Sequence, residues 1–227
     1  MAEPEPMGPT QHDPAVQAGY ASQQAYTERV DAVRNDTQLS ELAKAEAVVE
    51  AYEAQNAELQ RLHSDLYGRR QARYEHLHAQ LPVGPGITPD ASPADASVLA
   101  AAFRNSLEKA REASRDQRHA MLNDAMRFGD QTMIRAIITA AEEVSDTRLI
   151  DAWAASTGQE ALVTELRAVN VQRHGHDTMA ALWEGQAFRA PRRPPEVGDL
   201  HALRKQAEET AQADARRRRF NPNVSRY

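Results

Sequence analysis

The chain has 227 residues and a formal net charge of −6, and 41% of its residues are hydrophobic but only 5% aromatic. Large apolar side chains are therefore scarce, so we expect a small core and long solvated extensions. The absence of cysteine excludes disulfides, thiolate metal sites and cysteine nucleophiles. The first residues are acidic and proline-rich, unlike a secretory signal, and no run approaches the roughly 20 apolar residues that span a bilayer, so we expect no membrane contact.

Residues 1–36 are expected to form an N-terminal arm followed by a weak helix. Residues 1 to about 13 are polar and rich in proline, a composition typical of an extended arm. From Pro14 onward the apolar residues keep roughly helical steps, but their face is thin and Gly19 lies within it. We therefore expect this helix to need a neighbour.

Residues 37–81 contain the longest helical pattern, and part of it repeats every seven residues. One seam position holds Leu42, Val49 and Asn56, and the other holds Ala45, Tyr52, Leu59 and Leu66. Two interpretations are open, because about three imperfect heptads are near the minimum for a coiled coil. Either the helix forms an intermolecular coiled coil whose register Asn56 fixes, or it packs on its own domain. A helix of this length, about 60 Å, suits an assembly better than an enzyme.

Prolines and glycines break the helical pattern in residues 82–92, which predicts a linker or a wrapping arm. Ser92 is the expected N-cap of the next helix, and Pro93 is its first residue, where a missing N–H costs nothing. Residues 93–188 then carry the apolar stripes of about five or six short helices, which we expect to form a compact bundle.

The densest run of large apolar side chains in this bundle lies between Met121 and Trp153. Gly129 is expected to end one of its helices, and Asp130 is expected to cap the next. Two Ser/Thr-x-x-Glu/Gln patterns predict capping boxes, one formed by Ser114 with Gln117 and the other by Thr157 with Glu160.

Residues 189–199 are rich in proline and arginine and predict an extended linker, and residues 200–227 predict a basic C-terminal helix, capped by Asp199, with a docking tail. From Arg189 onward ten basic and five acidic residues give +5, whereas the preceding 17 basic and 28 acidic residues give −11. An acidic body thus carries a basic tail. The helix is polar on all sides and would be marginal alone in water.

A candidate partner-binding set lies at the end of this tail. Clustered arginines can neutralise phosphates, and an aromatic ring can stack on a base. The same residues equally suit an acidic protein groove, and helix C-termini favour basic residues through the helix dipole alone. The candidate residues are Arg216, Arg217, Arg218, Arg219, Phe220 and Tyr227, together with Leu42, Val49, Asn56 and Leu59 of the long helix.

No set of residues amounts to a catalytic, cofactor or metal site, so we expect no enzyme. His174, His176 and Asp177 could ligate a metal, but a polar turn ended by glycine explains the same HGHD sequence. Adjacent glutamates on a helix diverge by about 100 degrees, which argues against paired catalytic carboxylates. The sequence also has no phosphate-binding glycine loop, nucleophile elbow or metalloprotease signature.

The segments ASVLAAAFRNSLEKA and RFGDQTMIRAIITAAEEVSDTRLIDAW resemble small helical virion proteins of tailed bacteriophages that infect actinobacteria. The resemblance covers about residues 90–170 and carries over no functional residue. It implies a structural protein of the virion, assembled in the host cytoplasm and placed in the head or near the head-to-tail junction, whose partners are capsid, portal or connector subunits.

Together these patterns predict an all-α protein with a small bundle of short helices, a long N-terminal helix and extended arms at both ends, which acts in assembly without a cofactor. We expect self-association through the long helix and contact with packaged DNA. Two alternatives are open. One is an internal scaffolding protein that is lost from finished particles. The other is a nucleic-acid-binding protein whose arginine cluster binds less tightly as salt rises.

Overall fold

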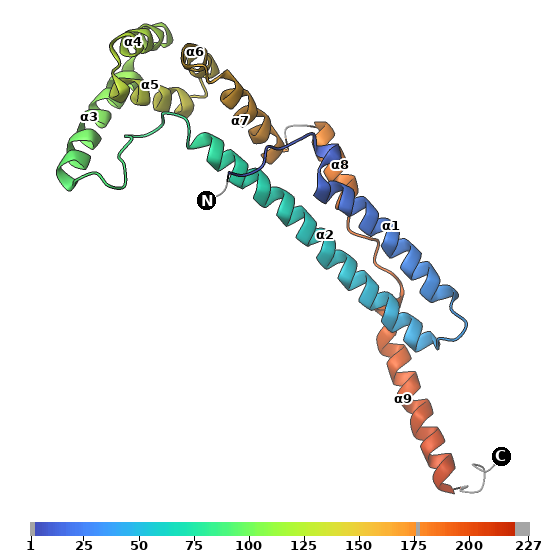
Figure 1. The fold of residues 1–227 in the computed structure, drawn as a ribbon. Helices are drawn as coiled ribbons and strands as arrows, with labels where there is room; N and C mark the ends of the chain where they lie inside the picture. Colours follow the sequence, from blue (N-terminus) through green and yellow to red (C-terminus); the bar gives the residue numbers. More distant parts are fainter. Residues whose placement is uncertain (1–2, 176–177, 221–227) are drawn as a thin grey trace. The chain divides into compact units, whose positions relative to one another are not determined.

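The computed structural model describes residues 3–175 and 178–220, and the side chains up to residue 217 (Figure 1). Over these residues every regular element is a helix and no strand occurs, so the predicted all-α class is confirmed. A short 3-10 helix, η1 (Thr10–His12), precedes the α-helices. These are α1 (Pro14–Asn35), α2 (Glu41–His78), α3 (Pro93–Glu112), α4 (Arg115–Phe128), α5 (Gln131–Glu143), α6 (Thr147–Thr157), α7 (Glu160–Arg173), α8 (Thr178–Ala187) and α9 (Glu196–Phe220). None of the helices in the described ranges is both long enough and apolar enough to cross a bilayer.

The chain divides into two units. Unit 1 comprises Met1–Met7 with Arg69–His176, and unit 2 comprises Gly8–Gly68 with Asp177–Tyr227. The long helix α2 therefore contributes residues to both units. This division differs from the predicted boundaries, because α8 belongs to unit 2 and not to the bundle expected over residues 93–188. The first residues, expected to form an extended arm, belong to unit 1.

Helix α5 lies at the centre of unit 1, where it packs against α3, α4 and α6. Ile137 and Ile138 of α5 and Leu149 of α6 are completely buried, and Trp153 of α6 joins the same core. The dense apolar run predicted from Met121 to Trp153 is thus the middle of this core. Because burying one such aliphatic side chain contributes about 1.5–3 kcal/mol, this run supplies much of the stability of unit 1.

The helix ends of unit 1 follow the predicted signals at most positions. The Ser92 hydroxyl accepts a hydrogen bond from the Asp95 N–H, and Pro93 is the first residue of α3. Gly129 ends α4 with φ of 70°, in the left-handed region that favours glycine. The Asp130 carboxylate accepts a hydrogen bond from the Met133 N–H at 3.0 Å and so caps α5.

One predicted capping box is present and the other prediction is wrong. At the start of α4 the Ser114 hydroxyl accepts from the Gln117 N–H, and the Ser114 N–H donates to the Gln117 side chain at 2.8 Å. Thr157 instead ends α6 and donates its hydroxyl to the Trp153 carbonyl at 2.8 Å. Since that hydroxyl is satisfied within its own helix, α7 begins after Gln159 without a side-chain cap.

Replacing Ser114 by alanine is expected to lower the free energy of unfolding of unit 1 by about 1 kcal/mol, because the first turn of α4 loses its cap. Urea denaturation checks this value. Ser97→Ala is the matched control, since Ser97 lies exposed within α3 and alanine is the better helix former there. Equal destabilisation by both substitutions would contradict the role of Ser114 as a cap.

Two segments without helical structure are held on unit 1. In the segment 82–92 the Gly84 N–H donates to the Thr139 hydroxyl at 3.0 Å, and Arg135 donates to the Val83 carbonyl. This contact with α5 agrees with the wrapping-arm interpretation. Near the N-terminus, Glu3 accepts a hydrogen bond from the buried Arg73 at 3.0 Å.

Unit 2 is built on α1 and the part of α2 up to Gly68, which run side by side in opposite directions (Figure 1). Val30 of α1 packs with Val48 and Ala51 of α2 in a small apolar cluster. Farther along the same interface, the Ser22 hydroxyl donates to the buried Gln55 side chain at 2.8 Å. The thin apolar face predicted for residues 14–35 therefore has its neighbour within the chain.

Candidate binding surfaces

Helix α8 is fixed to α1 by a close approach of the two backbones. A Cβ atom added at Gly19 would lie 2.7 Å from the carbonyl oxygen of Ala187, so only glycine fits between them. The Gln23 side chain donates to the carbonyls of Gln186, at 2.7 Å, and Ala187, at 2.6 Å. These hydrogen bonds satisfy carbonyls that the end of α8 leaves free.

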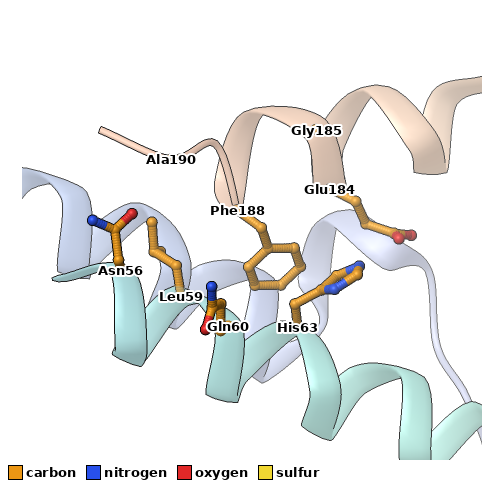
Figure 2. A pocket seen from close by; sticks show the side chains of 8 residues that line it. All are labelled: Asn56, Leu59, Gln60, His63, Glu184, Gly185, Phe188 and Ala190. Carbon is orange, nitrogen blue, oxygen red and sulfur yellow. The ribbon is translucent and has the colours of Figure 1, made fainter. Parts of the chain in front are cut away.

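Between α8 and α9 the chain has no regular secondary structure, and we call residues 188–195 the strap. At its start, Phe188 projects toward α2 beside His63, with the two ring centroids 5.2 Å apart (Figure 2). Near its end, Pro194 is buried. The strap therefore lies over the groove between α1 and α2, held by one aromatic and one proline side chain.

Open cavities lie beside the strap. The first has a volume of about 310 Å³ and lies between Phe188 and the α2 residues Asn56, Leu59 and His63 (Figure 2). The second has a volume of about 630 Å³ and lies between α1 and the end of the strap, including Arg192. The strap thus fills its groove incompletely and is not sealed in by neighbouring side chains.

Helix α9 is anchored to the α1–α2 pair by ion pairs. Arg34 of α1 donates two hydrogen bonds to the Glu196 carboxylate, at 2.8 and 3.0 Å. Arg204 donates to Glu46 of α2 at 3.0 Å. Both anchors lie in the first part of α9, so a clip of two salt bridges holds the start of this helix.

The Arg34–Glu196 pair also shifts the acid–base behaviour of both partners. The hydrogen bond from Arg34 holds the pKa of Glu196 below its ordinary value of 4.5, and the hydrogen bond to Glu196 raises the pKa of Arg34. A carboxyl group whose pKa is lowered in the folded state stabilises that state at neutral pH. This contribution is lost as pH falls through the lowered pKa.

We therefore expect the α9 clip to weaken upon acidification below about pH 4.5. A carbon-13 NMR titration of the Glu196 carboxyl group measures its pKa directly. Arg34→Gln should raise this pKa toward its ordinary value, whereas Arg29→Gln, on the same helix, should leave it unchanged. An unchanged pKa in the Arg34 variant would contradict the geometry of the pair.

The distal part of α9 is exposed on every side. Residues 208–217 are all exposed, and they include the predicted binding residues Arg216 and Arg217. Arg218, Arg219 and Phe220 continue the helix, but their side chains, like the whole of Tyr227, lie outside the described residues. The helix starts at Glu196, so the predicted cap at Asp199 is wrong. The Pro195 carbonyl accepts from the Asp199 N–H at 3.2 Å and opens the helix earlier.

The predicted seam residues of α2 differ in how deeply they are buried. Leu59 is 3% exposed, but Leu42, Val49 and Asn56 are only partly buried. Asn56 donates to the Tyr52 carbonyl of its own helix at 2.9 Å. The deeply buried positions of this region, Ala45, Val48, Ala51, Gln55 and Leu59, recur at three- and four-residue steps. That spacing suits packing on the chain's own domain, the second of the two interpretations.

The described part of the chain offers no cluster of three or more histidine or acidic side chains that could hold a metal ion. His174 is exposed at the end of α7, and the other two residues of the HGHD sequence, His176 and Asp177, lie outside the described residues. Two surfaces of the described residues are the groove beside the strap and the exposed distal α9. Both offer chemistry for binding a partner.

Sequence reasoning missed the residues that organise unit 2. Arg34 and Glu196 are 162 positions apart, and neither belongs to a motif. Gly19 carried a signal, as a glycine inside a helical pattern, but the sequence does not show which helix approaches it.

No family model, no curated protein and no solved structure matches the chain.

Proposed function

We propose that the chain is a structural subunit of a tailed-phage particle, placed in the head or at the head-to-tail junction. It acts by binding neighbouring chains through its arms, without catalysis. The observation that carries this proposal is the distal half of α9, which is exposed on every side over residues 208–217 and leads into the arginine cluster.

An exposed helix of this composition has a physical reason to bind something. Isolated short helices are marginal in water, and most helical stability in proteins comes from packing against a neighbour. In the described residues, distal α9 has no such neighbour. A partner surface that covers it would supply the missing stabilisation, and its arginines favour a partner that carries negative charge.

The phage setting is supported by the sequence resemblance. The two resembling segments, residues 96–110 and 127–153, correspond to α3 and to the α5–α6 core of unit 1. In this proposal unit 1 is the rigid body of the subunit, and unit 2 carries the binding arm. Particles made of many copies offer neighbouring surfaces at high local concentration, which suits weak contacts made by several arms.

An internal scaffolding protein is the second candidate. It is favoured by the charge of distal α9, which is exposed over residues 208–217 and leads into the arginine cluster. Contacts between exposed charges contribute at most about 1 kcal/mol each, so a scaffold that binds through them can release its partners. In this role the basic helix would grip capsid subunits during assembly and leave before the particle is complete.

Density-gradient fractionation of a phage lysate that contains this chain tests the proposal. Quantitative mass spectrometry of each fraction should find the chain in mature particles at a constant ratio to the major capsid protein. Its presence in precursor particles only would favour the scaffold. Its release from particles by nuclease would indicate contact with packaged DNA. Recovery solely among free soluble proteins would contradict both particle roles.

A further inference from the structure

We propose that α9 of one copy docks against α1 and α2 of a second copy, with the strap as the connection, so that neighbouring chains are joined by exchange of this helix. The inference rests on the proposed assembly function, since it names a second copy of the chain as a partner. It follows from how the tail is held in unit 2. The contacts between the groove and the tail are specific, but they contribute little free energy.

Specificity comes from paired anchors at defined positions. The groove presents Arg34 and Glu46, and α9 presents Glu196 and Arg204, so each side offers one charge of each sign. The alternating arrangement fixes the register of α9, because sliding the helix would place like charges opposite each other.

Weakness comes from exposure. In the Arg204–Glu46 pair both side chains are about half exposed, at 56% and 46%. In the Arg34–Glu196 pair the arginine is 43% exposed and the carboxylate 20%. The first pair gains little, because solvent and salt screen it, and the arginine of the second is likewise open to water. The two cavities beside the strap leave its side chains incompletely packed. The tail can therefore leave its own groove at low cost in free energy.

The same contacts form when the groove belongs to another copy, which makes exchange an inexpensive route to association. What decides between the two arrangements is the concentration of neighbouring grooves and the reach of the strap. Eight extended residues span about 25 Å. Prolines in the strap restrict its backbone, and α8 stays fixed to α1 through Gln23, so the strap is the segment that redirects α9.

A pair of charge-reversed chains tests the exchange. Arg34→Glu places a second carboxylate opposite Glu196, and Glu196→Arg places a second guanidinium group opposite Arg34. When the two variants are mixed, an exchanged pair places each tail opposite a groove residue of the other sign, at both sites. We expect native mass spectrometry to show a one-to-one heterodimer, with at least tenfold less dimer in either variant alone.

Two controls make the result specific. The double variant Arg34→Glu with Glu196→Arg restores opposite charges within one chain and should self-associate like the unchanged chain. Arg61 and Glu58 form an exposed pair inside α2 at 2.8 Å, so mixing Arg61→Glu with Glu58→Arg should yield no preference for the heterodimer. Circular dichroism of every variant should show that the helices are intact, since none of the four side chains is fully buried.

The amount of heterodimer in the mixture is compared with the amount of homodimer that each variant forms alone. If the mixture contains no more dimer than the single variants, the exchange is overturned. This result is separable from failure of the proposed function. If the chain cosediments with particles but the charge-reversed pair does not associate, the tail binds in its own groove only and the particle role stands. If the heterodimer forms but the chain is absent from particles, the exchange stands and the particle role fails.

Discussion

Replacing Gly19 by alanine is expected to lower the free energy of unfolding of unit 2 by about 1–3 kcal/mol, the usual cost of overpacking a fitted site. The new Cβ atom would lie 2.7 Å from the Ala187 carbonyl oxygen, which is backbone and cannot turn aside. Moving α8 away would relieve the clash but would lengthen the hydrogen bonds that Gln23 donates to this end of α8.

Gly185→Ala is the matched control for this prediction. Gly185 lies in α8 of the same unit, and nothing is within 4 Å of a Cβ atom placed there. Alanine at such a helical position should stabilise the unit by about 0.5–1 kcal/mol. If Gly19→Ala also stabilised the chain, the close contact between α1 and α8 would be wrong.

The two tryptophans allow each unit to be followed separately. Trp153 belongs to unit 1 and Trp183 to unit 2. Chains labelled with fluorotryptophan therefore give one fluorine NMR signal from each unit during urea denaturation. Gly19→Ala should lower the midpoint that the Trp183 signal reports.

Replacing Ile137 by alanine is expected to lower the free energy of unfolding of unit 1 by about 2–5 kcal/mol. Ile137 lies in the middle of α5, is completely buried, and belongs to the core shared with α3, α4 and α6. Alanine would leave a cavity that three surrounding helices could fill only partly. The Trp153 signal reports the loss.

Val144→Ala provides the comparison for this core substitution. Val144 follows α5 directly and is 58% exposed, so its truncation should change the stability by less than about 0.5 kcal/mol. Equal costs for the two substitutions would mean that α5 is not the centre of the unit 1 core.

Local structure in unit 1 could be predicted from sequence because its signals are short-range. The cap at Ser92, the capping box at Ser114 and the glycine stop at Gly129 each depend on residues within one helical turn. The apolar steps around Ile137 likewise identify a buried face without reference to a partner. Thr157 is an exception. Its hydroxyl could have capped the start of α7, but it donates a hydrogen bond to the Trp153 carbonyl at the end of α6.

The division into units could not be predicted because it depends on contacts between distant segments. Helix α8 has an apolar pattern that would suit the bundle of residues 93–188, but it packs against α1 through Gly19. The same holds for the clip on α9, where exposed charged residues such as Arg204 and Glu46 look like any solvated surface. Charged surface positions carry little information about their partners.

Self-association through exposed arms is tested most directly by the mass of the purified full-length chain in solution, measured by light scattering over rising concentration at low and high salt. We expect the mass to rise above that of one chain with concentration at low salt. The rise should persist at high salt, because the ionic anchors of α9 form equally in the closed and the exchanged arrangements. The mass of a single chain at every concentration and salt would contradict binding between copies.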